Sequence, residues 1–156
     1  MEDLKALSQV AEFHKTFKHP IVDKATIPTR ERSQLRIDLI AEELKELQEA
    51  VNDNNMVEIA DALCDLQYVL AGAVLEFGLA SNFKTLFDEV HRSNMSKACK
   101  TVEEANDTIT HYKNNGNTNA YFKEIDGLFL VYRDGDHKTL KSINYSPADL
   151  KGLLKQ

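Results

Sequence analysis

Two acidic clusters lie close together in residues 39–72, LIAEELKELQEAVNDNNMVEIADALCDLQYVLAG, and this stretch decides the fold. Leucine, isoleucine, valine and alanine recur at helical spacing on both sides of the polar segment 52–55. That spacing predicts two long helices, and the asparagines between them are typical of a tight turn and of helix caps. Because the turn is short, we expect the two helices to lie side by side and antiparallel.

The acids of the first predicted helix divide between two faces. On a wheel of about 100° per residue, Glu43 and Glu46 lie beside the apolar stripe, whereas Glu49 points to the opposite, solvated face. Glu42 lies between that solvated face and Glu46. The apolar stripe, which predicts the buried side of the helix, consists of Ile40, Leu44, Leu47 and Val51.

The acids of the second predicted helix share one face. Glu58, Asp61 and Asp65 fall within roughly 60° of one another, and residues 59–75 are apolar on nearly every other side. That pattern predicts a buried helix, where an ionised carboxylate is unfavourable unless a cation neutralises it. Few basic residues accompany these acids, and Arg36 is the nearest candidate on the first helix. Carboxylates on facing helices suit Mg²⁺, or Mn²⁺ in its place, so we expect a metal site.

Composition narrows the function classes. The chain has 156 residues, of which 42% are hydrophobic, and a net charge of −6, which suits one globular domain. No basic stripe of the kind typical of nucleic-acid binders is present, so no nucleic-acid partner is expected. Residues 66–79 are too short and too interrupted to span a membrane, and residues 1–5 do not resemble a signal peptide. With Cys64 and Cys99 outside any CxxC pair, we expect free thiols and a cytoplasmic protein.

The rest of the chain predicts a mainly α protein of four to five helices with a small C-terminal β-hairpin and a short terminal helix. A helix over 4–17 precedes a loop bounded by Pro20 and Pro28, and Thr101-Val102-Glu103-Glu104 is typical of a capping box. We expect a helical domain over 1–116, with 117–156 packed on it as an appendage. The other predicted elements are a helix from 81 or 82 to about 97, strands over 121–125, 128–132 and 139–143, and a helix opening at 146–149.

The spacing of the acids resembles a known signature. Glu-Glu-x-x-Glu at 42–46, eleven residues, and Glu-x-x-Asp at 58–61 are similar to the motif of the MazG-like all-α NTP pyrophosphohydrolases. Dimeric dUTPases and phosphoribosyl-ATP pyrophosphohydrolases belong to the same superfamily. The resemblance covers about residues 1–98 and includes the segment HRSNMSK at 91–97. It implies a MazG-like helical bundle that hydrolyses a nucleoside triphosphate to a monophosphate and pyrophosphate.

The resemblance also implies roles for particular residues. Glu42, Glu43, Glu46 and Lys97 would be catalytic, with Glu42 orienting or deprotonating the attacking water. The implied Mg²⁺ ligands are Glu43, Glu46, Glu58 and Asp61, with Asp65 holding an additional metal or a metal-bound water. The implied substrate contacts are Lys97, Asn94, Arg92, Arg36 and His14. The resemblance further implies a deoxynucleotide-directed or house-cleaning role and a homodimer or dimer of dimers.

Several alternatives stay open at this point. The acidic runs could be a plain solvated face, and His14 could be an ordinary core residue. A di-iron carboxylate bundle is disfavoured, because such sites use Glu-x-x-His and neither predicted motif helix contains a histidine. A non-catalytic nucleotide-binding helical interaction module would retain Mg²⁺ binding without turnover.

Overall fold

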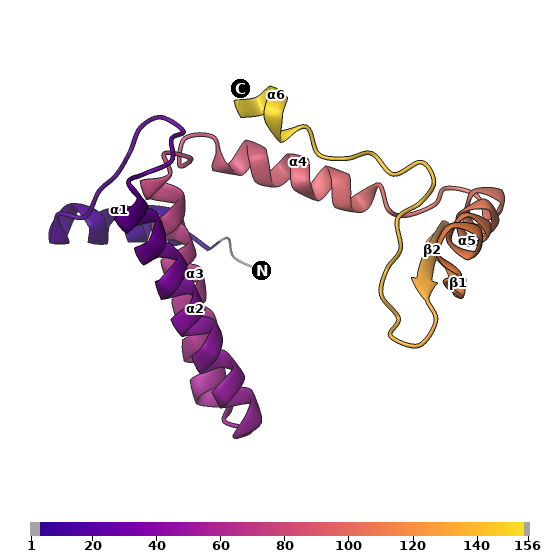
Figure 1. Cartoon of the computed structure of the whole chain (residues 1–156), viewed down its shortest axis with the longest axis horizontal. Helices are drawn as coiled ribbons and strands as arrows, with labels where there is room; N and C mark the ends of the chain where they lie inside the picture. The colour runs from indigo at the N-terminus through magenta and orange to yellow at the C-terminus, as the bar shows by residue number, and fades with distance from the viewer. Residues whose placement is uncertain (1–3, 155–156) are drawn as a thin grey trace. The chain divides into compact units, whose positions relative to one another are not determined.

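The computed structural model describes residues 4–154 and confirms the mainly helical architecture with one small hairpin (Figure 1). The chain divides into two compact units, and the boundary falls between Lys84 and Thr85. Within residues 4–154, no helix is long and apolar enough to cross a membrane. The elements are α1 (Ala6–Phe17), α2 (Arg30–Asn52), α3 (Met56–Glu76), α4 (Phe83–Met95), α5 (Val102–Gly116), β1 (Ala120–Ile125), β2 (Leu128–Arg133) and α6 (Leu150–Leu154).

The first unit is built on the predicted pair of long helices. α2 and α3 lie side by side along their length (Figure 1). Asn54 adopts a left-handed φ of 53°, which reverses the chain between them. The side chain of Asn55 then accepts hydrogen bonds from the N–H groups of Val57 and Glu58 at 3.2 and 3.4 Å, which caps α3. The predicted turn and helix ends are therefore confirmed to within a residue or two.

α1 and the following loop close one end of this helix pair. Val10 of α1 packs with Ala71 and Leu75 of α3 in the core of the unit. The loop is tied to the end of α3, because the Val22 N–H donates to the Leu75 carbonyl at 3.0 Å. Gly78 has a φ of 68°, and a Cβ there would lie 2.0 Å from the Lys24 carbonyl oxygen, so only glycine fits. Gly78 is therefore the glycine that follows the C-cap of α3.

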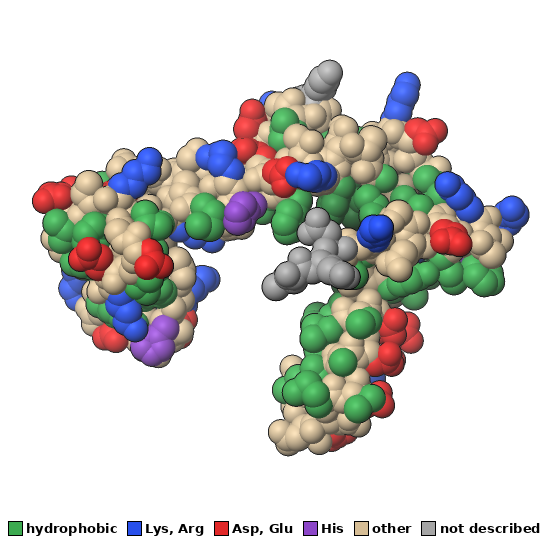
Figure 2. All heavy atoms as spheres, turned by 180° about the vertical axis from the view of Figure 1, so that it is seen from behind, with side chains coloured by type: hydrophobic (Ala, Val, Ile, Leu, Met, Phe, Trp, Pro, Cys, Tyr) green, Lys and Arg blue, Asp and Glu red, His purple; other side chains and the backbone are tan. Residues whose placement is uncertain are grey.

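The burial expected for α2 and α3 is partly wrong in a single copy of the chain. Leu44 and Val51, predicted as part of the buried stripe of α2, are 57% and 49% exposed, and Leu63 of α3 is 52% exposed. Burial on α3 is concentrated in residues 71–76. The reason is that the helices packing on α3 leave much of its first half uncovered. Figure 2 shows apolar side chains gathered at the free end of the α2–α3 pair, with acidic side chains along its edge.

The second unit packs the hairpin of β1 and β2 against α5. As predicted, Thr101 caps α5 by accepting from the Glu104 N–H at 3.2 Å, and Glu104 reaches back to the N–H of Lys100 at 2.8 Å. Asp126 and Gly127 both have positive φ, which suits a two-residue hairpin loop. The core of this unit consists of Cys99, Ala105, Val131 and Leu140. Cys64 and Cys99 are both free thiols, as expected.

Two predictions for the C-terminal region are wrong. The strand over 139–143 is absent, and Thr139 forms only an isolated bridge with Tyr132. Further along, the N–H groups of Lys141 and Ile143 donate to side chains of α5. The terminal helix begins at Leu150 instead of within 146–149, and the Asp149 carboxylate accepts from the Gly152 N–H at 2.9 Å in its first turn. The Ser146 N–H instead donates to Oγ of Ser96, just after the end of α4.

Candidate functional site

Glu43 is the centre of the acidic cluster. It is half-buried on α2, and burial raises the pKa of its carboxyl group above the ordinary value. The negative charges of Asp65, Glu46, Glu42 and Asp61 raise that pKa further, in this order of size. The structure therefore brings two faces of α2 and α3 together around one carboxylate, as the spacing of the acids predicted.

One oxygen of this carboxylate has no partner. Oε2 of Glu43 is buried and accepts no hydrogen bond. Within residues 4–154, no lysine or arginine forms an ion pair with the acids of the cluster; Lys45 instead pairs with Glu49 at 3.4 Å on the outer face of α2. A buried carboxylate oxygen without a donor is costly. The chemistry of the donor set therefore fits a divalent cation.

The remaining acids are more open than the sequence suggested. Glu58, Asp61 and Asp65 of α3 are exposed, so the predicted cost of burying them does not apply in a single copy of the chain. Among the described residues, no three His, Cys, Asp or Glu side chains converge closely enough to hold a metal ion by themselves. Mg²⁺ is commonly held by one or two carboxylates together with water and substrate phosphates. The arrangement is compatible with a cation that is completed by a polyanionic ligand.

A cavity of about 380 Å³ lies next to the acidic cluster in the first unit. Leu39 lines it one helical turn from Glu43, and Tyr68 and Val69 line it one turn from Asp65, about 6 Å along each helix axis. The full lining consists of Val10, Phe13, His14, His19, Leu35, Arg36, Leu39, Tyr68, Val69 and Gly72. The cavity is therefore mostly apolar with three basic side chains.

Aromatic rings form one side of this cavity. Phe13 stacks on His19 with ring centroids 5.7 Å apart and planes 13° from parallel. Tyr68 meets Phe13 edge to face, again with centroids 5.7 Å apart. Such rings offer a flat apolar wall that suits a planar ligand. Phe17 also contacts the Phe13 ring, at 4.4 Å between centroids, but it is not part of the cavity lining.

His14, a predicted substrate contact, is buried in the wall of the cavity. Burial lowers the pKa of its imidazole, and the charge of Arg36 lowers it further, while a hydrogen bond to the Pro20 carbonyl opposes the shift. The ring is therefore neutral at pH 7. Since a carbonyl can only accept, Nδ1 carries the proton and donates to Pro20 at 2.8 Å, which leaves Nε2 as an acceptor.

Arg36 is held by a buried network that the sequence analysis missed. Arg36 and Arg32 of α2 both form ion pairs with Glu76 of α3, which is 1% exposed. Burial alone would raise the pKa of Glu76, but the two guanidinium groups outweigh it and hold that pKa below its usual value. A Cβ on Gly72 would lie only 2.7 Å from Nη1 of Arg36, so this glycine makes room for the network.

A sequence signal for this network was present. Arg32 and Arg36 are spaced four residues apart on the first motif helix, and Glu76 interrupts an apolar run at the far end of the second. In an antiparallel pair, the start of one helix lies beside the end of the other. The spacing could therefore have predicted the contact between these three residues.

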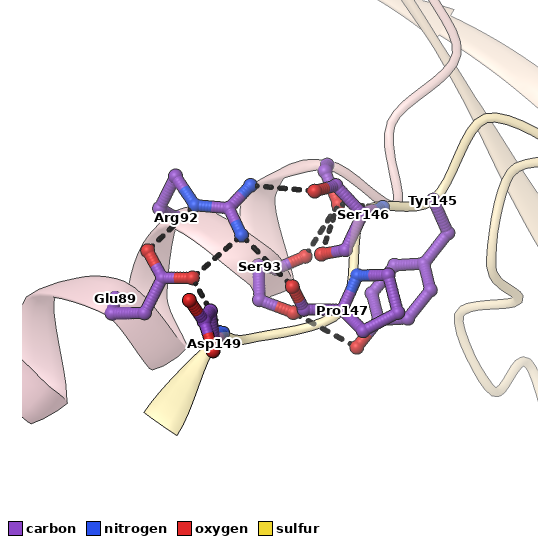
Figure 3. Close-up of polar contacts among 8 residues, drawn as sticks. Glu89, Arg92, Ser93, Tyr145, Ser146, Pro147 and Asp149 are labelled. Carbon is purple, nitrogen blue, oxygen red and sulfur yellow. Dashed lines mark hydrogen bonds and ion pairs between the residues drawn. The ribbon is translucent and has the colours of Figure 1, made fainter. Parts of the chain in front are cut away.

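The other predicted substrate contacts belong to the second unit. Lys97 Nζ donates to Oδ1 of Asn94 at 2.7 Å, so the structure brings these two residues together at the end of α4. Arg92 forms an ion pair with Glu89 at 2.7 Å and donates to Ser146 and Pro147. The guanidinium of Arg92 is thus occupied by neighbours within its own unit, as Figure 3 shows.

The fold and the site together define a helical protein with a carboxylate cluster beside an aromatic cavity. The family model of phosphoribosyl-ATP pyrophosphohydrolase matches residues 10–94, more than half of the chain. The chain belongs to this family, which is part of the MazG-like all-α NTP pyrophosphohydrolase superfamily, and the resemblance seen in the sequence is confirmed. The family implies a pyrophosphohydrolase, a hydrolase that acts on nucleotide phosphoanhydrides.

A viral protein is similar to the whole chain. An uncharacterized protein of Acanthamoeba polyphaga mimivirus is 25% identical, and the alignment covers 94% of this chain and 94% of the relative. The similarity therefore extends beyond residues 10–94 into the second unit.

Proposed function

We propose that the chain is a Mg²⁺-dependent nucleoside triphosphate pyrophosphohydrolase that converts a (d)NTP and water to a (d)NMP and pyrophosphate. The observation that carries the proposal is Glu43, whose buried oxygen lacks a partner at the centre of an acidic cluster. Membership in a pyrophosphohydrolase family supports the reaction type. The bond that breaks is the anhydride between the α- and β-phosphates.

The acids of α2 and α3 supply the proposed metal site. Glu43, Glu46, Glu58 and Asp61 would hold Mg²⁺, or Mn²⁺ in its place, and Asp65 would hold an additional ion or its water. A divalent cation bound there neutralises phosphate charge and makes a water more acidic. The protein's own contribution is to place these carboxylates on two packed helices, where substrate phosphates would complete the coordination of the cation.

Glu42 is the proposed acceptor of the water's proton. It is exposed on α2 and adjoins Glu43 without belonging to the proposed ligand set. A carboxylate outside that set keeps a free lone pair with which to take a proton.

The aromatic cavity is the proposed site for the nucleoside. It begins one helical turn from Glu43 and Asp65, so a nucleotide with its phosphates at the acids would extend its sugar and base into it. The ring of Phe13 would stack on the base. His14 and Arg36, two of the three basic side chains that line the cavity, would contact the base edge.

Lys97 and Asn94 are further proposed contacts to the triphosphate, as the resemblance implies. Lys97 carries the positive charge, and the bond from its Nζ to Asn94 orients it. Arg92, also implied by the resemblance, is a weaker candidate because its N–H groups already bind Glu89 and residues 146 and 147.

A second copy of the chain is the proposed cover for the exposed face of α2 and α3. Leu63 of α3 and Leu44 of α2 are more than half exposed, and Met56 is 73% exposed. Contiguous apolar surface of this kind is typical of an interface. We expect a homodimer or a dimer of dimers, which Leu63→Glu should dissociate in light scattering. Ile27→Glu, on the exposed loop, is the matched control and should leave the mass unchanged.

The test of the reaction is product analysis across a panel of NTPs and dNTPs, with phosphoribosyl-ATP included because of the family name. We expect monophosphate and pyrophosphate from the wild type with Mg²⁺, and a deoxynucleotide-directed or broad house-cleaning preference. Glu46→Gln and Asp61→Asn should lower kcat by at least about a hundredfold, since each removes a charged ligand. Glu49→Gln, an acid on the outer face of α2, should leave kcat unchanged.

Two results would contradict the proposal. If kcat falls equally in Glu49→Gln and in the site variants, the acidic cluster has no special role in the reaction. Mg²⁺-dependent nucleotide binding by a folded wild type without any turnover would favour the non-catalytic binding module.

A further inference from the structure

We call residues 141–149 the C-terminal strap. The strap has no regular secondary structure, but hydrogen bonds to two helices hold it in place. The Tyr145 N–H donates to the Ser142 carbonyl within the strap at 2.9 Å, but four other backbone N–H groups donate to side chains outside it. The bonds run from Lys141 to the Tyr112 hydroxyl (3.1 Å), Ile143 to Thr108 Oγ1 (3.1 Å), Ser146 to Ser96 Oγ (2.9 Å) and Asp149 to Glu89 Oε1 (2.9 Å). The strap therefore crosses α5 first and α4 second.

Arg92 fastens the strap to α4. Its Nε and Nη2 bind Glu89 at 2.7 and 2.8 Å, while Nη1 donates to Ser146 Oγ and Nη2 to the Pro147 carbonyl, both at 3.0 Å. Figure 3 shows the guanidinium between the Glu89 carboxylate and the strap. The Tyr145 hydroxyl adds a bond of 2.8 Å to Ser93 Oγ. Two side chains, Arg92 and Tyr145, thus link the strap to the last two turns of the helix.

The strap covers one face of α4 and leaves the neighbouring face open. Three of its partners lie on one face of the helix, spaced i, i+3 and i+4, and the fourth follows just after the end of the helix. They are Glu89, Arg92, Ser93 and Ser96. Asn94 lies about 100° from Ser93 around the helix, next to that face, and is exposed. Lys97 follows the end of the helix and donates to Asn94. The strap can therefore hold the end of α4 without covering this pair.

The end of a helix needs such support, because its last carbonyls have no partner within the helix and the last turn frays. Lys97 follows the end of α4 by two residues, and its N–H bonds to the Asn94 carbonyl at 3.2 Å. Ser96 Oγ binds the Ser93 carbonyl at 2.7 Å and also accepts from the strap. Order at Lys97 thus depends on contacts between α4 and the strap.

We propose that the C-terminal strap is a positioning element for Lys97 and Asn94, and that Arg92 and Tyr145 are positioning residues that act through it. This rests on the proposed function, in which Lys97 contacts the triphosphate. Arg92 accordingly does not contact the substrate; it holds the strap against α4.

The test compares full-length Arg92→Gln, Tyr145→Phe and Lys97→Gln with wild type, with His91→Gln as an exposed control on the same helix. Three quantities are measured: KM and kcat, the Kd of inorganic tripolyphosphate with Mg²⁺, and hydrogen exchange at the Ser146 and Asp149 amides. We expect faster exchange at these amides in Arg92→Gln, with KM and the tripolyphosphate Kd about tenfold higher and kcat unchanged, because a uniform binding contact is weakened. Tyr145→Phe should show the same pattern to a smaller extent, and His91→Gln should match wild type.

The outcomes separate this inference from the proposed function. If exchange becomes faster in Arg92→Gln while KM and Kd stay at wild-type values and Lys97→Gln raises both, the strap has a structural role only and the inference is wrong. Slow exchange in Arg92→Gln would also overturn it, because the strap would then not depend on Arg92. If Lys97→Gln itself leaves the tripolyphosphate Kd unchanged, the assignment of Lys97 in the proposed function fails and the inference fails with it.

Discussion

Gly72→Ala tests the buried network at the floor of the cavity. An alanine Cβ would lie 2.7 Å from Nη1 of Arg36 and 3.2 Å from Nε2 of His14. Arg36 is only 7% exposed and is bound to Glu76, so it cannot move aside without weakening that ion pair. The added methyl group therefore acts on the contact between α2 and α3.

The expected change in the free energy of unfolding is the sum of two opposing effects. Alanine is favoured over glycine in a helix interior by about 1 kcal/mol. Displacing Arg36 from Glu76 weakens a hydrogen bond between charged groups, which is worth about 1.5–3 kcal/mol. We therefore expect Gly72→Ala to lower the free energy of unfolding by about 0.5–2 kcal/mol, against the direction that helix propensity alone predicts.

The assay is urea denaturation, monitored by circular dichroism. Hydrogen exchange then shows whether the loss of stability is in α3. Gly116→Ala is the matched control, because the nearest atom to its Cβ would be Thr118 Oγ1 at an ordinary 3.4 Å, and no loss of stability is expected. In an Arg36→Met background, which removes the guanidinium, Gly72→Ala should instead stabilise by up to about 1 kcal/mol. If Gly72→Ala stabilises the unmodified protein as well, Arg36 is not fixed by Glu76 and the reasoning is refuted.

Three further variants test other parts of the structure. Glu76→Gln leaves the buried Arg36 and the partly exposed Arg32 without their carboxylate. It should lower the free energy of unfolding in urea by about 3 kcal/mol or more, whereas a loss under about 1 kcal/mol would show that the network is not buried in solution. The hydrogen bond from Arg92 lowers the pKa of Glu89 to about 2, so the stability that ionised Glu89 contributes should be complete above pH 4.5 and lost as the pH falls towards 2. Glu89→Gln should therefore abolish the part of the acid dependence of the melting temperature that Glu89 causes, and an unchanged profile of melting temperature against pH would contradict this. Leu140→Ala should destabilise the second unit by about 2–5 kcal/mol, with faster exchange in α5, and unaltered exchange there would argue against Leu140 as a core residue.

The long helices could be predicted because their signals are local. Apolar spacing and asparagine caps act within a few residues, and both the two helices and the Asn55 cap are confirmed. The C-terminal region was harder, because its hydrogen bonds depend on distant side chains. Residues 139–143 alternate like a strand, and the Leu140 N–H does donate to Val131 of β2. The N–H groups of Lys141 and Ile143, however, donate to Tyr112 and Thr108 of α5 in place of a neighbouring strand.

The acidic cluster was likewise predictable from spacing on two facing helices, whereas its surroundings were not. Arg36 was expected to contact substrate, and the structure shows it paired with Glu76, forty residues away in the chain. The burial expected on α3 was wrong for a single copy because periodicity indicates which face is apolar, not what covers it. The proposed second copy would cover the exposed Leu63 and Met56.

The most direct test of the proposed function is to identify the products of a dNTP by ³¹P NMR with wild-type protein, after removal of divalent cations and again after addition of Mg²⁺. We predict monophosphate and pyrophosphate in equal amounts, formed only when Mg²⁺ is present. Orthophosphate and nucleoside diphosphate, or binding of the nucleotide with no product at all, would contradict the account.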